Sequence, residues 1–590
     1  MRRMALVLVA VGALGASFAC GERAGFQNQE VPAFVEQDAG SDVVAPPPVS
    51  CEGTVRCSRD FRAVVDGCDD SKVLTECPAD QGCSTTTGKC VPACEAATDS
   101  TMGCEFVALP PPRNSQMVGS CFGAVIANTW GIPARIEAAF GSDPIDVAAH
   151  ARIIRTDGVT TTYEAFDGEL KPGEMAAVFL TELPSGGSAS VRCPEGVVAA
   201  VRKETSMHGT LRGPTFQIKA TAPVSAYTVY PIGVSTGSAA TLLLPLASWK
   251  NDYIVTNVWG TRRTSTASQY PSTHILAAQN DTEITLVPNV HIFGGTNVDP
   301  AEKGKATTYR LSRGEQIQLS QEDELTGTRI AADKPIAVSV GHELLDVPSN
   351  VCCGEQSQTA LFPLKTWGSE YALAPYRSRR TKEVPEDYLY RITGAVDGTV
   401  LTYEPTRPND APATIAAGES VVFTTQEPFV VKSQDSAHAF AIHSYMTGAN
   451  FAVPSGDEGD PELMTVIPTE QYLGRYVFWV DPTFASSHLV VVRVREEGKD
   501  FKPVVLDCAG PLEDWKPLGT SGKYEYTRPW LKKAGKPQAL GTGTCTGGRR
   551  EITSDGPVGV SVWGTDYFGS YGYPGGAGLR ALNTLDVQIK

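Results

Sequence analysis

PLASWKNDY at residues 245–253 recurs with the same spacing as PLKTWGSEY at 363–371 and PTEQYLGRY at 468–476. Each copy has a proline, an aromatic residue four positions later and a tyrosine four positions after that. Each also leads into a short run of β-branched and aromatic residues, which is typical of a strand. Three matches at one fixed spacing are not accidental, so the chain contains an internal repeat.

A second marker gives the length of the repeat. It is a short apolar run that begins at Pro223, Pro335 and Pro557, and His438 takes the place of the proline in the third copy. These four positions lie 112, 103 and 119 residues apart. Such a period exceeds the roughly 40 to 50 residues of one propeller blade and is close to the roughly 100 of an immunoglobulin-like sandwich.

A third marker, the dipeptide Gly-Glu, opens a strand-like run at 173–174, 314–315 and 418–419, and the fourth copy has Gly535-Lys536 instead. Alternating apolar residues within each repeat are typical of half-buried antiparallel strands. We therefore predict an all-β fold of about four tandem β-sandwich-like repeats. The predicted repeats are 105–240, 241–345, 346–455 and 456–590. A β-propeller-like arrangement with two blades per repeat is the alternative.

The recurring aromatic residues have two interpretations. We expect them to fill the core or the seam between consecutive repeats, where large rings bury the most area. The alternative is a sugar site built from stacked rings.

Composition places the chain among globular proteins rich in turns. Of 590 residues, 57 are glycine and 41 proline, 42% are hydrophobic and 20% are charged, which excludes a disordered chain or a coiled coil. The net charge is −16. Such a charge excludes nucleic acid as a main partner, because phosphate binding needs a basic surface.

The N-terminus has the layout of an export signal. Residues 1–19 hold two arginines, then an apolar run, and end in small residues before Cys20. The run Ser17-Phe18-Ala19-Cys20 resembles a bacterial lipoprotein cleavage box, which predicts lipidation of Cys20. An ordinary secretory signal and a secreted protein are the alternative. Residues 20–50 lack apolar periodicity and end in three prolines, so we interpret them as a linker to the lipid anchor.

Seven cysteines crowd into residues 51–94, and Cys104 supplies an even eighth. In an exported chain this density predicts a small module, residues 51–104, held by disulfides. Zinc is the weaker alternative, because the paired C-x2-C knuckles of zinc ribbons are absent. The predicted disulfide cysteines of the module are Cys51, Cys57, Cys68, Cys77, Cys83, Cys90, Cys94 and Cys104.

Six cysteines remain downstream. Cys121 and Cys193 both fall in the first predicted repeat, and Cys508 and Cys545 both fall in the fourth. If pairing stays within repeats, the adjacent Cys352 and Cys353 must bridge each other. The alternative leaves one or both of them free, or pairs them with cysteines of the fourth repeat.

Two motifs raise the question of catalysis or metal binding. Residues 233–237 read Gly-Val-Ser-Thr-Gly, the form of a nucleophile elbow, with Ser235 as the nucleophile of a secreted hydrolase. The elbow needs a helix after it, and the start of the next repeat follows instead, so a Gly/Ser turn is the preferred interpretation. His342 and Glu343 precede the cysteine pair, but adjacent cysteines in an oxidising space form bridges. We therefore predict no catalytic residue, metal or cofactor.

The C-terminal strand followed by Ser-Tyr-Gly-Tyr-Pro at 570–574, the proline–aromatic–tyrosine motifs, and Met-Gly-Cys-Glu-Phe at 102–106 together define a resemblance. They resemble the N-terminal domain of the IgG Fc-binding mucus protein family, over roughly residues 104–585. Bacterial surface lipoproteins also carry that domain. The resemblance implies a non-enzymatic extracellular protein for binding or adhesion, whose ligand is an extracellular protein or glycan. A structural envelope protein is the alternative.

The lipidation hypothesis gives a direct test. Substituting Cys20→Ser removes the thiol that would carry the lipid, so we expect the variant to leave the membrane fraction and appear in the soluble exported fraction. Immunoblotting after membrane fractionation measures this. Unchanged membrane association of the variant would contradict the lipoprotein interpretation.

Overall fold

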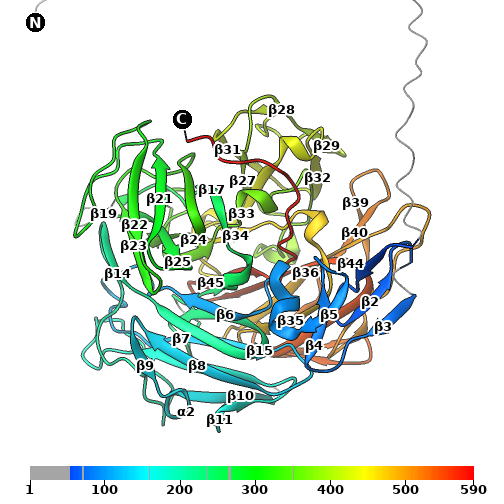
Figure 1. Cartoon of the computed structure of the whole chain (residues 1–590), viewed down its shortest axis with the longest axis horizontal. Coiled ribbons are helices and arrows are strands. Elements are labelled where there is room, and N and C mark those ends of the chain that lie inside the picture. The colour runs from blue at the N-terminus through cyan, green and yellow to red at the C-terminus, as the bar shows by residue number, and fades with distance from the viewer. Residues whose placement is uncertain are drawn as a thin grey trace, which may run out of the picture. The chain divides into compact units, whose positions relative to one another are not determined.

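Strands are the main secondary structure of the described chain, and its three α-helices each have four residues (Figure 1). The computed structural model describes residues 53–589 except 70–71, 158–159, 236, 264–267 and 350. The export signal, Cys20, the linker and Cys51 lie outside the described residues. The predicted all-β fold is confirmed. Contacts join Glu52–Lys590 into one compact unit, and the number and boundaries of the repeats stay a prediction.

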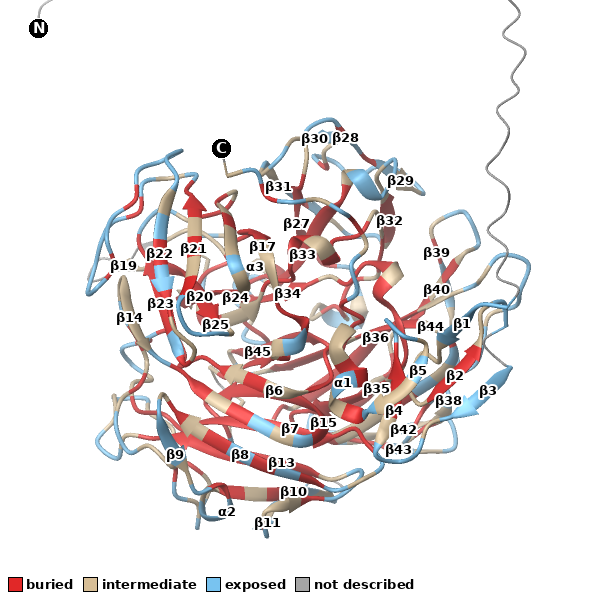
Figure 2. Ribbon diagram, viewed as in Figure 1, coloured by how far each residue is buried: buried red, intermediate tan, exposed pale blue. Residues whose placement is uncertain are grey.

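The cysteine-rich module consists of a three-stranded sheet, a hairpin and two short helices. Its elements are β1 (Val55–Cys57), β2 (Ala63–Asp66), β3 (Val73–Glu76), β4 (Gln81–Ser84), β5 (Lys89–Pro92), α1 (Ala93–Ala96) and the 3-10 helix η1 (Ala97–Asp99). The edge strand β3 is exposed along its whole length (Figure 2). So small a module buries little apolar surface, and disulfides supply part of its stability.

The first sheet after the module is antiparallel and has ten strands. Its central strands β7 and β13 read as continuous apolar runs because they are buried on both faces, whereas β8 alternates buried and exposed residues. The members are β6 (Gly103–Ala108), β7 (Phe122–Asn128), β8 (Ala134–Phe140), β9 (Asp143–Ile145), β10 (Ala151–Asp157), β11 (Thr160–Ala165), β12 (Glu169–Leu170), β13 (Met175–Thr181), β15 (Phe216–Tyr230) and β16 (Ala239–Leu242), with α2 (Val147–His150) between β9 and β10.

The second sheet has eight strands and includes β14, which precedes β15 in the chain. Its members are β14 (Leu211–Pro214), β17 (Lys250–Ile254), β20 (Pro271–Ala277), β21 (Thr282–Val287), β22 (Thr307–Leu311), β23 (Glu315–Ser320), β24 (Arg329–Leu345) and β25 (Glu355–Ala360). The 3-10 helix η2 (Leu246–Ser248) leads into it, and β18 (Arg262–Arg263) pairs with β19 (Ser268–Gln269). The strand β14 lies before the predicted boundary at residue 240 but belongs to the second sheet. The sheets therefore do not follow that boundary.

The third region is divided among smaller sheets. They are formed by β26 (Glu370–Leu373), β27 (Tyr388–Gly394), β28 (Thr399–Val400), β29 (Thr402–Glu404), β30 (Thr414–Ile415), β31 (Ser420–Thr425), β32 (Phe429–Lys432), β33 (Phe440–Met446) and β34 (Glu462–Thr465). Its helices are η3 (Leu364–Thr366), η4 (Thr381–Glu383), η5 (Ser436–His438) and α3 (Ala449–Ala452).

The fourth region is an eleven-stranded sheet that follows η6 (Thr469–Gln471). Its strands are β35 (Leu473–Val480), β36 (Ser486–Val494), β37 (Val504–Leu506), β38 (Gly510–Pro511), β39 (Lys516–Leu518), β40 (Tyr524–Thr527), β41 (Trp530–Lys533), β42 (Lys536–Leu540), β43 (Gly543–Cys545), β44 (Gly548–Asp566) and β45 (Gly569–Pro574).

The prolines of the second marker sit where the register of a long strand shifts. Pro223, Pro335 and Pro557 lie in β15, β24 and β44, at the points where pairing with β6, β17 and β35 is interrupted. A β-bulge leaves residues of one strand unpaired, so the missing N–H of proline costs no ladder hydrogen bond there. In the third region, where His438 replaces the proline, the long strand is broken into β32 and β33 by η5.

Each proline–aromatic–tyrosine motif is joined to the next second marker by a hydrogen bond. The tyrosine hydroxyl donates to a backbone carbonyl: Tyr253 to Ile336 at 2.8 Å, Tyr371 to Phe440 at 2.6 Å and Tyr476 to Val558 at 2.5 Å. The proline of the motif precedes a 3-10 helix in all three copies. The two sequence markers therefore meet at the same structural position in each copy.

The Gly-Glu marker forms one kind of turn. Gly173, Gly314 and Gly418 have φ values of 79°, 86° and 72°, in the region that favours glycine. The glutamate that follows each glycine accepts a hydrogen bond from the backbone N–H three residues before it, at 2.8–3.0 Å. Gly535 keeps the positive φ, and Lys536 in the fourth copy cannot supply the carboxylate. The marker therefore fixes a turn before a strand.

Four short strands that follow the long strands meet one another. β16, β25, β34 and β45 contact in that order, and β45 contacts β16, which closes the set; Figure 1 shows β25, β34 and β45 near the middle of the view. We call these four strands the hub. The core beside it is shared by sheets far apart in sequence, since the rings of Tyr227 in β15 and Tyr573 in β45 lie 5.1 Å apart.

The motif aromatics are buried rather than displayed. Trp249, Trp367 and Tyr472 are 4%, 5% and 7% exposed. The two tryptophan N–H groups donate to the carbonyls of Leu244 and Phe362. Rings enclosed in this way are unavailable for stacking on a sugar, so the prediction that they fill the core and the seams is confirmed.

The structure pairs the cysteines locally. The described disulfides are Cys57–Cys83, Cys77–Cys90, Cys94–Cys104, Cys121–Cys193, Cys352–Cys353 and Cys508–Cys545, and Cys68 is also disulfide-bonded. The fourth bridge of the module involves residues outside those described.

The tyrosine–carbonyl bond predicts a stability change. In Tyr253→Phe the buried Ile336 carbonyl loses its donor, which costs about 1–3 kcal/mol of the free energy of unfolding. Chemical denaturation followed by tryptophan fluorescence measures it. Tyr567→Phe removes a hydroxyl from a side chain in a residue that is 59% exposed and serves as the control, with a change below about 0.5 kcal/mol. Equal changes in the two variants would contradict a structural role for this bond.

Candidate functional site

A cleft of about 420 Å³ lies between the cysteine-rich module and the fourth region. Four further cavities are much smaller, between about 10 and 50 Å³. We call this space the module cleft. Its lining residues are Val55, Arg56, Cys57, Ser58, Arg59, Phe61, Thr85, Thr86, Asp99, Glu470, Gln471, Tyr472, Leu473, Gly578 and Arg580. Its volume is within the range of small-ligand sites.

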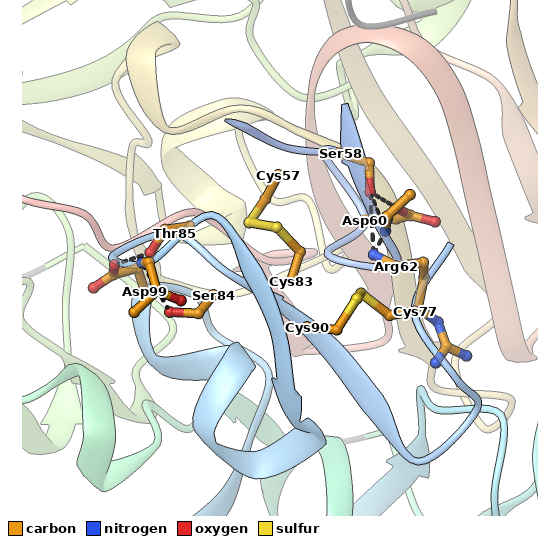
Figure 3. Close-up of a disulfide and its surroundings, with 12 residues drawn as sticks. Cys57, Ser58, Asp60, Arg62, Cys77, Cys83, Ser84, Thr85, Cys90 and Asp99 are labelled. Carbon is orange, nitrogen blue, oxygen red and sulfur yellow. Dashed lines mark hydrogen bonds between the residues drawn. A yellow bond between two sulfur atoms is a disulfide. The ribbon is translucent and has the colours of Figure 1, made fainter. Parts of the chain in front are cut away.

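A disulfide holds two walls of the module cleft. Cys57 ends β1 and Cys83 lies in β4, and their bond connects the turn at 58–62 to the loop at 85–86 (Figure 3). In that turn, Ser58 Oγ donates to Asp60 Oδ1 at 2.6 Å and accepts from the backbone N–H of Arg62. On the other side of the disulfide, Thr85 Oγ1 donates to Asp99 Oδ2 at 2.7 Å (Figure 3). These short-range bonds fix the backbone that carries Arg59.

The third wall comes from the fourth region and the C-terminal segment. Ser100 forms an isolated antiparallel bridge with Gly578, and the backbone N–H of Gly578 donates to the carbonyl of Gln471 in η6. The N–H of Leu579 donates to the carbonyl of Asp99 at 2.7 Å. The module is also tied to the first sheet, where the guanidinium of Arg62 lies 4.1 Å from the centre of the Trp130 ring.

Three arginines bring positive charge to this cleft of an acidic protein. Arg56 and Arg580 are exposed, and Arg59 is half-buried. Arg59 pairs with Glu496 through Nη2 and Oε1 at 2.8 Å, and Arg580 Nη2 donates to the carbonyl of Glu470. Partial burial, followed by the positive charge of Arg59, lowers the pKa of Arg580. Two guanidinium groups therefore repel each other across one space.

The two acidic lining residues are already engaged in hydrogen bonds. Glu470 Oε1 accepts from the backbone N–H and the hydroxyl of Ser369, and its Oε2 accepts from Thr469 Oγ1. Asp99 accepts from Thr85. Both carboxylates remain negatively charged, and their charges raise the pKa of Arg580, against the effects of burial and of Arg59.

A second polar cluster lies within the hub. Glu355, Asp460 and Glu462 are 1–2% exposed. Glu355 Oε2 accepts from the N–H of Ser570 at 3.0 Å, and Glu462 Oε1 accepts from Ser357 Oγ at 2.8 Å. Burial raises the pKa of Glu462 to about 8, and burial together with the charges of Asp460 and Glu462 raises that of Glu355. These carboxylates are enclosed, so they belong to the interior of the fold.

The residues that suggested a hydrolase or a metal site in the sequence do not form such a site in the structure. The strand β16 follows the loop that holds Ser235, and this loop lacks the helix that a nucleophile elbow requires. His342 Nε2 faces the carbonyl of Gly260, and Glu343 pairs with His208. Among the described residues, no group of three or more His, Cys, Asp or Glu side chains has an arrangement suited to a metal ion.

Sequence reasoning missed the module cleft. Arg56, Arg59 and Arg62 recur every third residue within the cysteine-rich module, and this spacing was a usable signal. Nothing in the sequence connects them to Arg580, which reaches the cleft only because the C-terminal segment pairs with residue 100.

Fold and cleft define an all-β, disulfide-rich domain with a cleft of the volume that small-ligand sites have. The family model described as IgGFc binding protein matches residues 239–564, more than half of the chain. The chain belongs to this family, which is a binding family. The match runs from β16 nearly to the end of β44, so the module and the first sheet apart from β16 lie outside it. No curated protein and no solved structure shows significant similarity to the chain.

Within the described residues, no helix has the length and apolar character needed to cross a membrane.

The buried carboxylates predict a pH dependence. The folded-state pKa of Glu462, about 8, lies above its ordinary value of 4.5, so the folded protein binds more protons than the unfolded chain between these values. The free energy of unfolding should therefore fall as pH rises from about 5 to 8, by at most about 1.4 kcal/mol per pH unit for this group. In Glu462→Gln we expect the free energy of unfolding to fall less over the same pH range. Urea denaturation at several pH values measures it, and an unchanged slope would contradict the assignment.

Proposed function

We propose that the protein is a cell-surface binding or adhesion protein without catalytic activity, anchored in the outer membrane or at the cell surface through lipid on Cys20. Its ligand is an extracellular protein. Membership of a binding family supports this, and no catalytic family matches. The disulfides support export to an oxidising compartment. The family description names immunoglobulin Fc, but no residue of this chain can be matched to that activity, so Fc is one probe among others.

The module cleft is the observation that carries the proposal. A concave polar site on a disulfide-held frame is what a ligand-binding protein presents. A structural envelope protein would instead need large apolar faces for assembly. The exposed large hydrophobic residues are scattered over distant segments, from the module to the end of β44: Val55, Val73, Leu74, Val198, Phe293, Val384, Val400, Val422, Val505 and Tyr567.

Reconstitution with purified ligands tests the proposal. The mature protein, carrying Cys20→Ser to keep it free of lipid, is used as bait on the cell surface and in the medium of its source, and purified Fc is tested beside the captured proteins. We expect at least one purified extracellular protein to bind saturably, and to bind equally after its glycans are removed. The bait with its disulfides reduced is the matched control.

Absence of saturable binding by every purified candidate would contradict the proposed function. Binding that disappears with the glycans would replace the protein ligand by a glycan.

A further inference from the structure

The module cleft has the chemistry to recognise carboxylates. Arg56, Arg59 and Arg580 line it, and they come from segments more than 500 residues apart in the chain. A guanidinium presents several N–H donors in a plane and binds carboxylates through paired, charge-assisted hydrogen bonds. The protein as a whole carries −16. The lining of the module cleft holds these three arginines and two acidic residues, Asp99 and Glu470, so its net charge of +1 is opposite in sign to that of the whole protein and favours anions there.

The apolar part of the lining distinguishes among anionic ligands. Val55 precedes Arg56 in the chain and is 47% exposed, whereas the apolar lining residues Tyr472 and Leu473 are each only 7% exposed. An apolar side chain next to the carboxylate would be covered by Val55. Sulfated or uronic polysaccharides carry charge without such side chains, so the lining favours a peptide.

An internal carboxylate already shows the mode of binding. Glu496, from the loop after β36, reaches Arg59 at 2.8 Å and Lys499 at 2.7 Å. The hydrogen bond from Lys499, followed by the charges of Lys499, Arg59 and Arg56, lowers the pKa of Glu496. Glu496 therefore competes with any external carboxylate for Arg59, and its removal would end that competition.

We propose that the module cleft binds an acidic segment of a protein, with Arg56, Arg59 and Arg580 receiving its carboxylates and the exposed Val55 covering an adjacent apolar side chain. This inference rests on the proposed function and names the chemistry of its ligand. Residue 580 belongs to the C-terminal segment, so the site is complete only when that segment is paired with residue 100.

A fluorescent peptide in which glutamate alternates with leucine is the probe, and fluorescence anisotropy with the full mature protein is the measurement. We expect saturable binding that weakens with added salt. The matched peptide with glutamine in place of glutamate should bind at least about tenfold more weakly. Heparin, a sulfated polysaccharide, should displace the peptide poorly.

Three variants localise the binding. Arg56→Gln and Arg580→Gln change exposed side chains, and each should weaken the peptide by about tenfold. Arg135→Gln changes an exposed arginine paired with Glu169 on the first sheet and is the control, with unchanged affinity. Glu496→Gln should tighten binding severalfold, because Arg59 and Arg56 lose an internal competitor. Partial unfolding cannot produce such a gain.

The outcomes separate this inference from the proposed function. An extracellular protein ligand that binds Arg56→Gln and Arg580→Gln as well as the unchanged protein leaves the proposed function standing and overturns the cleft assignment. Equal binding of the two peptides also overturns it, and tighter binding of heparin than of the peptide overturns the choice of an acidic protein segment. Peptide binding with the expected variant pattern, but without any reconstituted protein ligand, supports the cleft and contradicts the proposed function.

Discussion

A buried tyrosine hydroxyl bonded to a backbone carbonyl beside an interruption of the strand, a β-bulge in two regions and the helix η5 in the third, is the interaction on which the three matched regions depend. It joins positions 83, 69 and 82 residues apart in the chain. A bulge bends its strand and leaves backbone groups unpaired, and the hydroxyl satisfies a carbonyl at that bend. Beyond the bend, the second half of each long strand runs to the hub, where its following hairpin strand meets those of the other regions.

Much of this arrangement could be predicted from the sequence, because its parts are set locally. The prolines, the Gly-Glu turns and the motif tyrosines each have a specific backbone requirement, and such requirements recur as fixed spacings. The sequence did not show that β14 crosses into the second sheet or that the third region breaks into small sheets. Pairing of that kind depends on which edge is nearest in space. The family match extends over only residues 239–564, so the resemblance over residues 104–238 stays a hypothesis.

The candidate site was much less predictable. The disulfide count and the pairing within segments follow from parity and proximity in sequence, and the cysteines of the module were visible from their density alone. The module cleft is different, because it is assembled from Arg59, from η6 and from Arg580. No local pattern of spacing or periodicity relates these segments. The buried carboxylates of the hub could not be predicted from the sequence either. Glu355 and Glu462 lie at the starts of ordinary strands, and they become close only because the four strands of the hub contact one another.

The walls of the cleft are far apart in sequence, so we expect the module to fold before the cleft forms. The disulfides of the module close short loops, with cysteines 26, 13 and 10 residues apart, whereas Arg59 meets Glu496 across 437 residues and Thr101 meets Ala577 across 476. Contacts of such high contact order form late. The module can therefore close its disulfides well before a cleft exists beside it. Occupancy of the cleft by a ligand would report that closure of the whole fold is complete.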